Sequence, residues 1–218
     1  MNLNSDFSQR LVIQPDKLAW SHSPSSGVDQ KMLEQDGAEA ARTTSIVRYA
    51  PGASSPSHVH DLGVEVFVLK GVFSDESGDY GSGSYIKNAP GSVHAPHSAE
   101  GCTLFVKLGH MDVRDRQSVV VDTLKTNWHP GLVPGLAVMP LSSFETQNTA
   151  LVRWSPETYF SAHRHFGGEE ILVIAGVFED EHGRYPQGTW IRSPHLSFHQ
   201  PFSKEGCTIL VKTGHLLF

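Results

Sequence analysis

The chain has 218 residues, a formal net charge of −6, and 39% hydrophobic and 18% charged residues. This composition is that of a folded globular protein and excludes a disordered or collagen-like chain. The acidic balance argues against binding to nucleic acid, and no apolar run is long enough to span a membrane. Because the N-terminus has no basic segment followed by an apolar run, we expect a cytoplasmic protein.

The two halves of the chain repeat one another with an offset of 105 residues, which carries His58 onto His163. The sequence Glu-Gly-Cys-Thr, for example, occurs at the same place in both halves. Such a period indicates two copies of one structural unit. We therefore predict two domains, residues 1–115 and residues 116–218.

Short apolar segments follow one another along each half, separated by turns rich in Gly, Pro, Asp and Ser. The segments are rich in β-branched and aromatic residues, and no long stretch has a helical period. Acidic residues at 75–76 and 180–181 are expected in solvated hairpin turns. The pattern is typical of an all-β protein and predicts a jelly-roll barrel in each half. The clearest strand segments are residues 45–49, 66–69, 103–106 and 171–174.

A group of histidines in the first half has the spacing of a metal site. His58 and His60 are two residues apart, so their side chains leave the same face of a strand. Glu65 follows a turn and His94 enters a later strand, and both can reach the same place. A single histidine is more often a surface residue, but burying this set twice without metal would leave several polar groups without partners. The predicted ligands of the two halves are His58, His60, Glu65, His94, His163, His165, Glu170 and His199.

The second half offers two adjacent carboxylates at this position. Glu170 aligns with Glu65, whereas Glu169 aligns with Val64. The internal alignment therefore favours Glu170 as the ligand and leaves Glu169 pointing outward or supporting the site from behind.

Two motifs of the first half resemble those of the cupin superfamily. The first comprises Gly52, His58, His60, Glu65 and Gly71, and the second runs from Gly83 through Pro90 and Gly91 to His94. More narrowly, residues 100–110 and 176–194 resemble the ChrR-like cupins, which form the C-terminal sensing part of zinc-dependent anti-sigma factors. The resemblance covers essentially the whole chain. It implies two tandem cupin barrels, each a double-stranded β-helix, with metal held by the eight residues above.

The resemblance implies a metal-binding sensory or regulatory module, and the site chemistry offers an alternative. Those anti-sigma factors carry an N-terminal domain with His and Cys zinc ligands, but residues 1–40 contain no cysteine. We therefore do not expect this chain alone to bind a sigma factor. The alternative is a dioxygenase that cleaves a small oxygenated substrate, because three histidines and a carboxylate can hold a redox metal with open positions.

The ligand types also predict the cofactors and partners. We expect two divalent metal ions per chain, with zinc favoured over iron, manganese or nickel. Four protein ligands would close a tetrahedral zinc site, so a binding barrel with a structural metal is a third reading. A small-molecule ligand in the barrels and a homodimer are compatible with the sequence, whereas nucleic acid and membrane partners are not expected.

Overall fold

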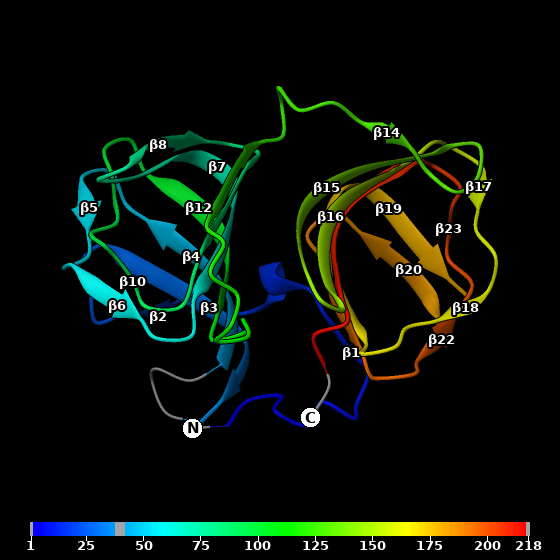
Figure 1. Cartoon of the computed structure of the whole chain (residues 1–218), viewed down its shortest axis with the longest axis horizontal. Coiled ribbons are helices and arrows are strands. Elements are labelled where there is room, and N and C mark those ends of the chain that lie inside the picture. Colours follow the sequence, from blue (N-terminus) through cyan, green and yellow to red (C-terminus); the bar gives the residue numbers. More distant parts are fainter. Residues whose placement is uncertain (1, 38–41, 217–218) are drawn as a thin grey trace. The chain divides into compact units, whose positions relative to one another are not determined.

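The computed structural model describes residues 2–37 and 42–216, and it confirms an all-β protein. One short 3-10 helix, Pro15–Lys17, interrupts the strands of the described chain (Figure 1). No helix among the described residues is long and apolar enough to cross a membrane. The chain divides into two compact units, which are described separately below.

The first unit contains residues 1–5 and 18–126 and forms one antiparallel barrel. The order of its main sheet is β13-β9-β7-β12-β4-β3-β2. These strands are β13 (Val119–Asp122), β9 (Ser84–Asn88), β7 (Val64–Asp75), β12 (Cys102–Leu108), β4 (Arg42–Tyr49), β3 (Val28–Asp36) and β2 (Ser21–His22). Three short strands, β5 (Ala53–Ser54), β8 (Gly78–Gly81) and β11 (His97–Ser98), extend it, and β6 (His58–His60) pairs with β10 (Ser92–His94).

The second unit contains residues 6–17 and 127–218 and repeats this arrangement. The order of its main sheet is β1-β21-β19-β24-β16-β15-β14. These strands are β1 (Leu11–Ile13), β21 (Trp190–Ser193), β19 (Glu169–Asp180), β24 (Cys207–Thr213), β16 (Gln147–Trp154), β15 (Leu136–Phe144) and β14 (His129–Pro130). The short strands are β17 (Thr158–Tyr159), β20 (Gly183–Pro186) and β23 (Phe202–Ser203), and β18 (His163–Arg164) pairs with β22 (Phe198–His199).

Two short strands lie in a different unit from the one expected from their position in the chain. β1 precedes the first barrel in sequence, yet it pairs with β21 of the second unit. β13 follows the predicted boundary at 115/116, yet it pairs with β9 of the first unit. The division of the chain by contacts therefore differs from the predicted domains 1–115 and 116–218.

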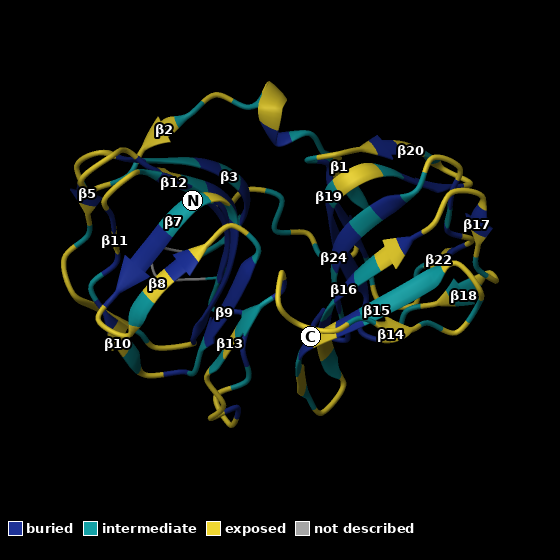
Figure 2. Ribbon diagram, turned by 90° about the horizontal axis from the view of Figure 1, so that it is seen from above, coloured by how far each residue is buried: buried dark blue, intermediate teal, exposed yellow. Residues whose placement is uncertain are grey.

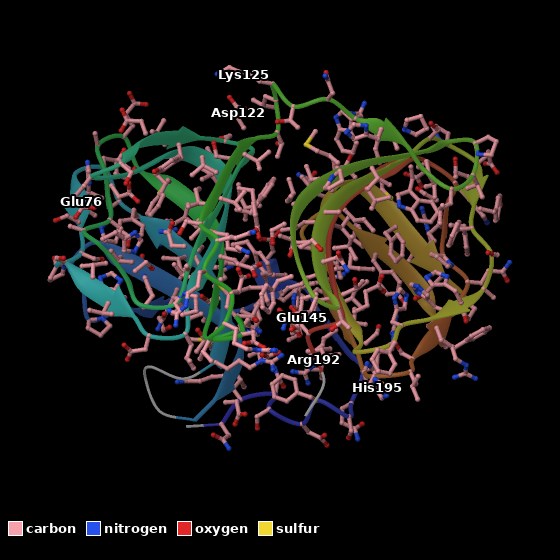
Figure 3. All side chains as sticks on the ribbon, in the orientation of Figure 1. Glu76, Asp122, Lys125, Glu145, Arg192 and His195 are labelled. Atoms are coloured by element: carbon pink, nitrogen blue, oxygen red, sulfur yellow. The ribbon has the colours of Figure 1, made fainter. Side chains whose placement is uncertain are left out.

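Hydrogen bonds and ring contacts fasten the segment around β1 to the second barrel. Arg192 on β21, labelled in Figure 3, donates a hydrogen bond of 2.7 Å to the carbonyl oxygen of Asp6. Its guanidinium group also lies 4.5 Å from the centre of the Phe7 ring. Arg10 donates hydrogen bonds to Asp180 and Tyr185, at 3.0 and 2.8 Å.

Apolar side chains on the inner face of each main sheet form the two cores, and the strands that carry them are largely buried (Figure 2). Val64, Val66 and Val68 alternate along β7 and all belong to the first core. Ile171 and Val173 take the equivalent places on β19. Since alternate residues of a strand share a face, Val64 and its equivalent Glu169 point toward the barrel interior.

The motif glycines Gly71 and Gly176 permit a close approach of two backbones. Both have positive φ angles, 79° and 72°. A Cβ atom would collide with the carbonyl oxygen of Gly101 at the first position and of Gly206 at the second. Only glycine satisfies both constraints, which explains its place at the bend of β7 and β19.

Candidate metal centres

Three histidines meet on the short hairpin-like pair β6 and β10 of the first barrel. His58 lies opposite His94 in this antiparallel pair. The Nε2 atoms of His60 and His94 are 2.8 Å apart, and the donor atoms of all three rings lie within 4.8 Å of one another. Three imidazole nitrogens converging on one point are a ligand set for zinc, iron, manganese, nickel or copper. The three histidines therefore fit a divalent transition metal.

The second barrel brings together His163, His165 and His199 on β18, the following turn and β22. His163 lies opposite His199, and the Nε2 atoms of His165 and His199 are 2.9 Å apart. Glu169 joins them: its carboxylate oxygens lie 3.4 Å from Nε2 of His165 and 3.7 Å from Nε2 of His199. This centre offers three imidazoles and one carboxylate.

The two predicted glutamates lie on the other face of their strands. Glu65 is the cross-strand neighbour of Lys87 and Lys107. Glu170 is likewise the neighbour of Arg192 and Lys212 and accepts a hydrogen bond of 3.0 Å from His215. Glu65 and Glu170 were predicted as ligands together with the histidines, but the structure places both on the other face and brings Glu169, not Glu170, beside His165 and His199.

Strand alternation could not decide between the adjacent positions, because both faces of β7 and β19 are rich in apolar residues. The missed signal is the pair of cationic residues that recurs in both halves. Lys87 and Arg192 are equivalent, as are Lys107 and Lys212, and each pair is buried. Buried cations are stabilised by carboxylates and other polar groups on the same face, so these Lys and Arg residues favour a place for Glu65 and Glu170 on this face of the sheet. Lys87 itself forms an ion pair with Asp115, at 2.7 Å.

The two centres consequently differ in charge. The first has Val64 where the second has Glu169, so its three described histidine donors come without a carboxylate. A divalent ion would keep two positive charges in the first centre and one in the second.

Hydrogen bonds behind the histidines fix how the rings present their nitrogens. Nδ1 of His58 lies 2.8 Å from the carbonyl oxygen of Pro56, and Nδ1 of His163 lies 2.9 Å from that of Ser161. A carbonyl oxygen only accepts, so each Nδ1 carries the proton and each Nε2 is free to bind metal.

In each centre, one aspartate lies next to Nδ1 of the third histidine. Asp75 Oδ2 lies 3.4 Å from Nδ1 of His94, and Asp180 Oδ2 lies 3.8 Å from Nδ1 of His199. Both aspartates are at the predicted hairpin turns but are buried, so the expectation that they are solvated is wrong. A carboxylate in this place orients the imidazole and raises its basicity.

Burial and mutual repulsion keep the central histidines neutral. Burial, followed by the neighbouring imidazoles, lowers the pKa of His60 to about 3, and the same causes lower the pKa of His165 to about 3. Burial raises the pKa of Glu169 to about 7, against the attraction of His199. Neutral imidazoles are the form that binds metal. Burial lowers the pKa of His199 as well, but the hydrogen bond with Asp180 and the charge of Glu169 outweigh burial and raise it.

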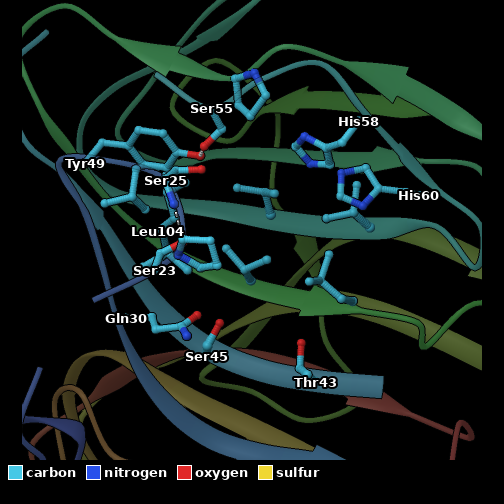
Figure 4. A pocket seen from close by; sticks show the side chains of 18 of the residues that line it. Ser23, Ser25, Gln30, Thr43, Ser45, Tyr49, Ser55, His58, His60 and Leu104 are labelled. Carbon is cyan, nitrogen blue, oxygen red and sulfur yellow. Dashed lines mark hydrogen bonds between the residues drawn. The ribbon is translucent and has the colours of Figure 1, made fainter. Parts of the chain in front are cut away.

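A cavity of about 800 Å³ lies inside the first barrel and reaches all three histidines (Figure 4). Figure 4 shows Gln30, Thr43 and Ser45 along the wall away from His58 and His60. Tyr49 and Ser55 form another part of the wall, with their hydroxyl oxygens 3.1 Å apart. Much of the remainder is apolar and includes Val66, Phe73, Leu104 and Val106.

In the second barrel, the positions equivalent to Tyr49 and Ser55 carry larger aromatic side chains. Trp154 replaces Tyr49 and is buried in the second core, and Phe160 replaces Ser55 and packs against that core. The Phe160 ring lies 5.1 Å from the ring of His163. The pair of hydroxyl groups of Tyr49 and Ser55 is thus a property of the first barrel.

Comparisons with known proteins agree with the fold. Residues 8–112 and 116–217 each match the family described as ChrR cupin-like domain. No curated protein matches the chain.

Solved structures share the fold at low sequence identity. A Nostoc punctiforme protein, provisionally described as a dioxygenase, is 14% identical with a TM-score of 0.81, and covers 96% of this chain and 84% of its own. Lactobacillus farciminis oxalate decarboxylase is 14% identical with a TM-score of 0.63 and covers 95% and 87%. Pseudaminobacter salicylatoxidans salicylate 1,2-dioxygenase is 11% identical with a TM-score of 0.63 and covers 85% and 76%. Because the family match extends over both halves, this chain belongs to the ChrR cupin-like family and contains two tandem cupin domains.

Proposed function

We propose that the chain is a metal-dependent dioxygenase whose chemistry takes place in the first barrel. The observation that carries this proposal is the cavity that opens directly onto His58, His60 and His94. Three ligands leave up to three further positions on an octahedral ion, enough for a chelating substrate and dioxygen. A dioxygenase that cleaves a carbon–carbon bond places both atoms of dioxygen in the two carbonyl or carboxyl groups it forms, so the substrate supplies all the electrons and no separate reductant is needed.

The residues of the first barrel would hold and shield the reacting groups. A bound redox-active metal such as iron, manganese or nickel would supply the oxygen chemistry. The three neutral imidazoles would hold it, and Asp75 would keep His94 in its orientation. The apolar part of the wall, including Val66 and Leu104, would exclude water from the substrate.

We assign a structural role to the second centre. Three histidines and Glu169 would complete a tetrahedral zinc site without an open position. Trp154 and Phe160 fill space that is part of the cavity in the first barrel. The chain would then carry two metal ions, one for chemistry and one for stability.

A sensory role is the second candidate, and the family match over both halves favours it. In that case a bound ligand or metal in the first barrel would change how the chain contacts a regulatory partner. The zinc ion expected in both centres under this candidate cannot activate dioxygen by a redox step.

The test is the metal content of anaerobically purified protein together with oxygen uptake. We expect a redox metal in the first centre, and uptake of oxygen with some member of a panel of small phenols and ketones. His60→Ala should abolish the uptake, whereas His97→Ala, which changes an exposed histidine outside the cluster, is the matched control. Zinc in both centres without oxygen uptake would contradict the enzyme and favour the sensor.

A further inference from the structure

We infer that the first barrel takes an organic molecule with one anionic oxygen head, which binds the metal, and an uncharged, hydrogen-bonding body. This inference rests on the first-barrel site proposed above and names its ligand class. It also separates that class from molecules with a second charge, such as dicarboxylates.

The ligand set of the first centre determines the charge of the head. His58, His60 and His94 contribute no charge, and Val64 takes the place that Glu169 has in the second centre. Asp75 lies behind His94, on the Nδ1 side, and so outside the donor set. A divalent ion therefore keeps excess positive charge where the cavity meets the histidines, and an anionic oxygen of the ligand is stabilised there.

The cavity wall determines the charge of the body. Apart from the histidines, none of the described lining residues carries a charged side chain. A second carboxylate on the ligand would lose its water without gaining an ionic partner. Uncharged hydroxyl, carbonyl or amide groups would instead meet the uncharged polar side chains of the wall, which are Ser23, Ser25, Gln30, Gln35, Thr43, Ser45, Tyr49 and Ser55.

The second barrel shows that two polar residues of this wall, Gln30 and Ser45, are not needed for the fold. Gln30 pairs with Val47, and Val138 pairs with the equivalent Val152, so Val138 occupies the place of Gln30. Ala150 likewise occupies the place of Ser45. Because the same barrel forms with apolar residues at these two positions, Gln30 and Ser45 of the first barrel are best explained by a ligand.

An isosteric pair of probes tests the inference in the cobalt-loaded, full-length protein without oxygen. Protocatechuate and its amide share one chelating catechol head and differ in a single distal charge. We expect the amide to bind at least about tenfold more tightly in a titration followed by cobalt absorption and calorimetry. Equal or tighter binding of protocatechuate, or no binding of either probe to metal-loaded protein, would overturn the inference.

Variants of the polar wall test whether its side chains bind the uncharged amide group. Gln30→Val with Ser45→Ala copies the second barrel and should remove most of the advantage of the amide over unsubstituted catechol. Ala150→Ser, at the equivalent place in the second barrel, should leave binding unchanged. An unchanged advantage in the double variant would overturn the role of the wall, and if that variant does not fold, the wild-type pair of probes still decides.

The binding result is independent of the proposed oxygen chemistry. Cobalt-loaded protein that prefers the amide, while iron-loaded protein takes up no oxygen, would retain the ligand class and reject the dioxygenase. If iron-loaded protein takes up oxygen but the two probes bind equally well, the dioxygenase is retained and the ligand class is rejected.

Discussion

Val64 and Glu169 are equivalent residues at the start of β7 and β19, and they make the two metal centres different. Both side chains point into their barrels, but only Glu169 offers a metal donor. The difference of one carboxylate changes both the number of ligands and the charge that the ion retains.

Exchanging these residues should exchange the properties of the centres. Val64→Glu should raise the zinc affinity of the first centre, and Glu169→Val should lower that of the second, each by about tenfold or more because one anionic ligand is gained or lost. Competition with a chromophoric chelator measures both affinities. Unchanged affinities would show that Glu169 is not a ligand. Glu170→Gln is the matched control, and its second centre should keep its metal, because Glu170 hydrogen-bonds His215 instead.

At the scale of the elements, the strands themselves could be predicted from the sequence. The segments 45–49, 66–69, 103–106 and 171–174 lie within β4, β7, β12 and β19. Their β-branched and aromatic residues fit a sheet with two covered faces. The convergence of three histidines in each half was also predicted, from the two-residue spacing of the first pair and, for His94 and His199, from the internal repeat and the resemblance to cupins.

The placement of β1 and β13 could not be predicted. Each is an edge strand of three or four residues, and its partner strand is fixed by contacts distant in sequence. The face of the sheet on which Glu65 and Glu170 lie could not be predicted either, because the cationic residues beside them are on neighbouring strands that are distant in sequence. Local periodicity carries neither kind of information.

The segment around β1 should influence the second metal centre through Arg10. The guanidinium group bonds Asp180, which stands behind His199. Burial alone would raise the pKa of Asp180, but its hydrogen bonds, together with the charge of Arg10, outweigh burial and hold the pKa at about 2. Arg10→Ala should therefore misplace this carboxylate and weaken metal binding in the second centre by about tenfold or more.

Chelator competition on the two centres separately checks this expectation. Arg10→Lys should restore part of the affinity, because it keeps the positive charge. Equal weakening of both centres by Arg10→Ala would contradict a local effect on Asp180.

At the scale of the whole molecule, the buried histidines should make the protein sensitive to acid. The folded-state pKa values of His60 and His165 are about 3, whereas an imidazole in water has a pKa of 6.5. As the pH falls below about 6.5, these two histidines therefore bind protons in the unfolded chain but not in the folded chain. Their contribution to stability is complete above about pH 6.5 and is lost as the pH falls toward 3.

Melting temperatures measured between pH 7 and 4 should fall with pH in both forms, and more steeply with metal, because protons also displace the ion. In metal-free protein Glu169 has the opposite effect. Because its pKa is raised to about 7, its contribution to the stability of the fold is lost as the pH rises through 7. A melting temperature independent of pH in this range, with or without metal, would contradict buried neutral histidines.

Elemental analysis of the reconstituted full-length protein and two single variants tests the central claim most directly. We expect close to two divalent ions per chain at neutral pH, because each unit has its own histidine set. His60→Ala and His165→Ala should each retain close to one ion, in the centre that was not changed. A metal content near zero in the unaltered protein, or loss of both ions from either variant, would contradict two independent metal centres.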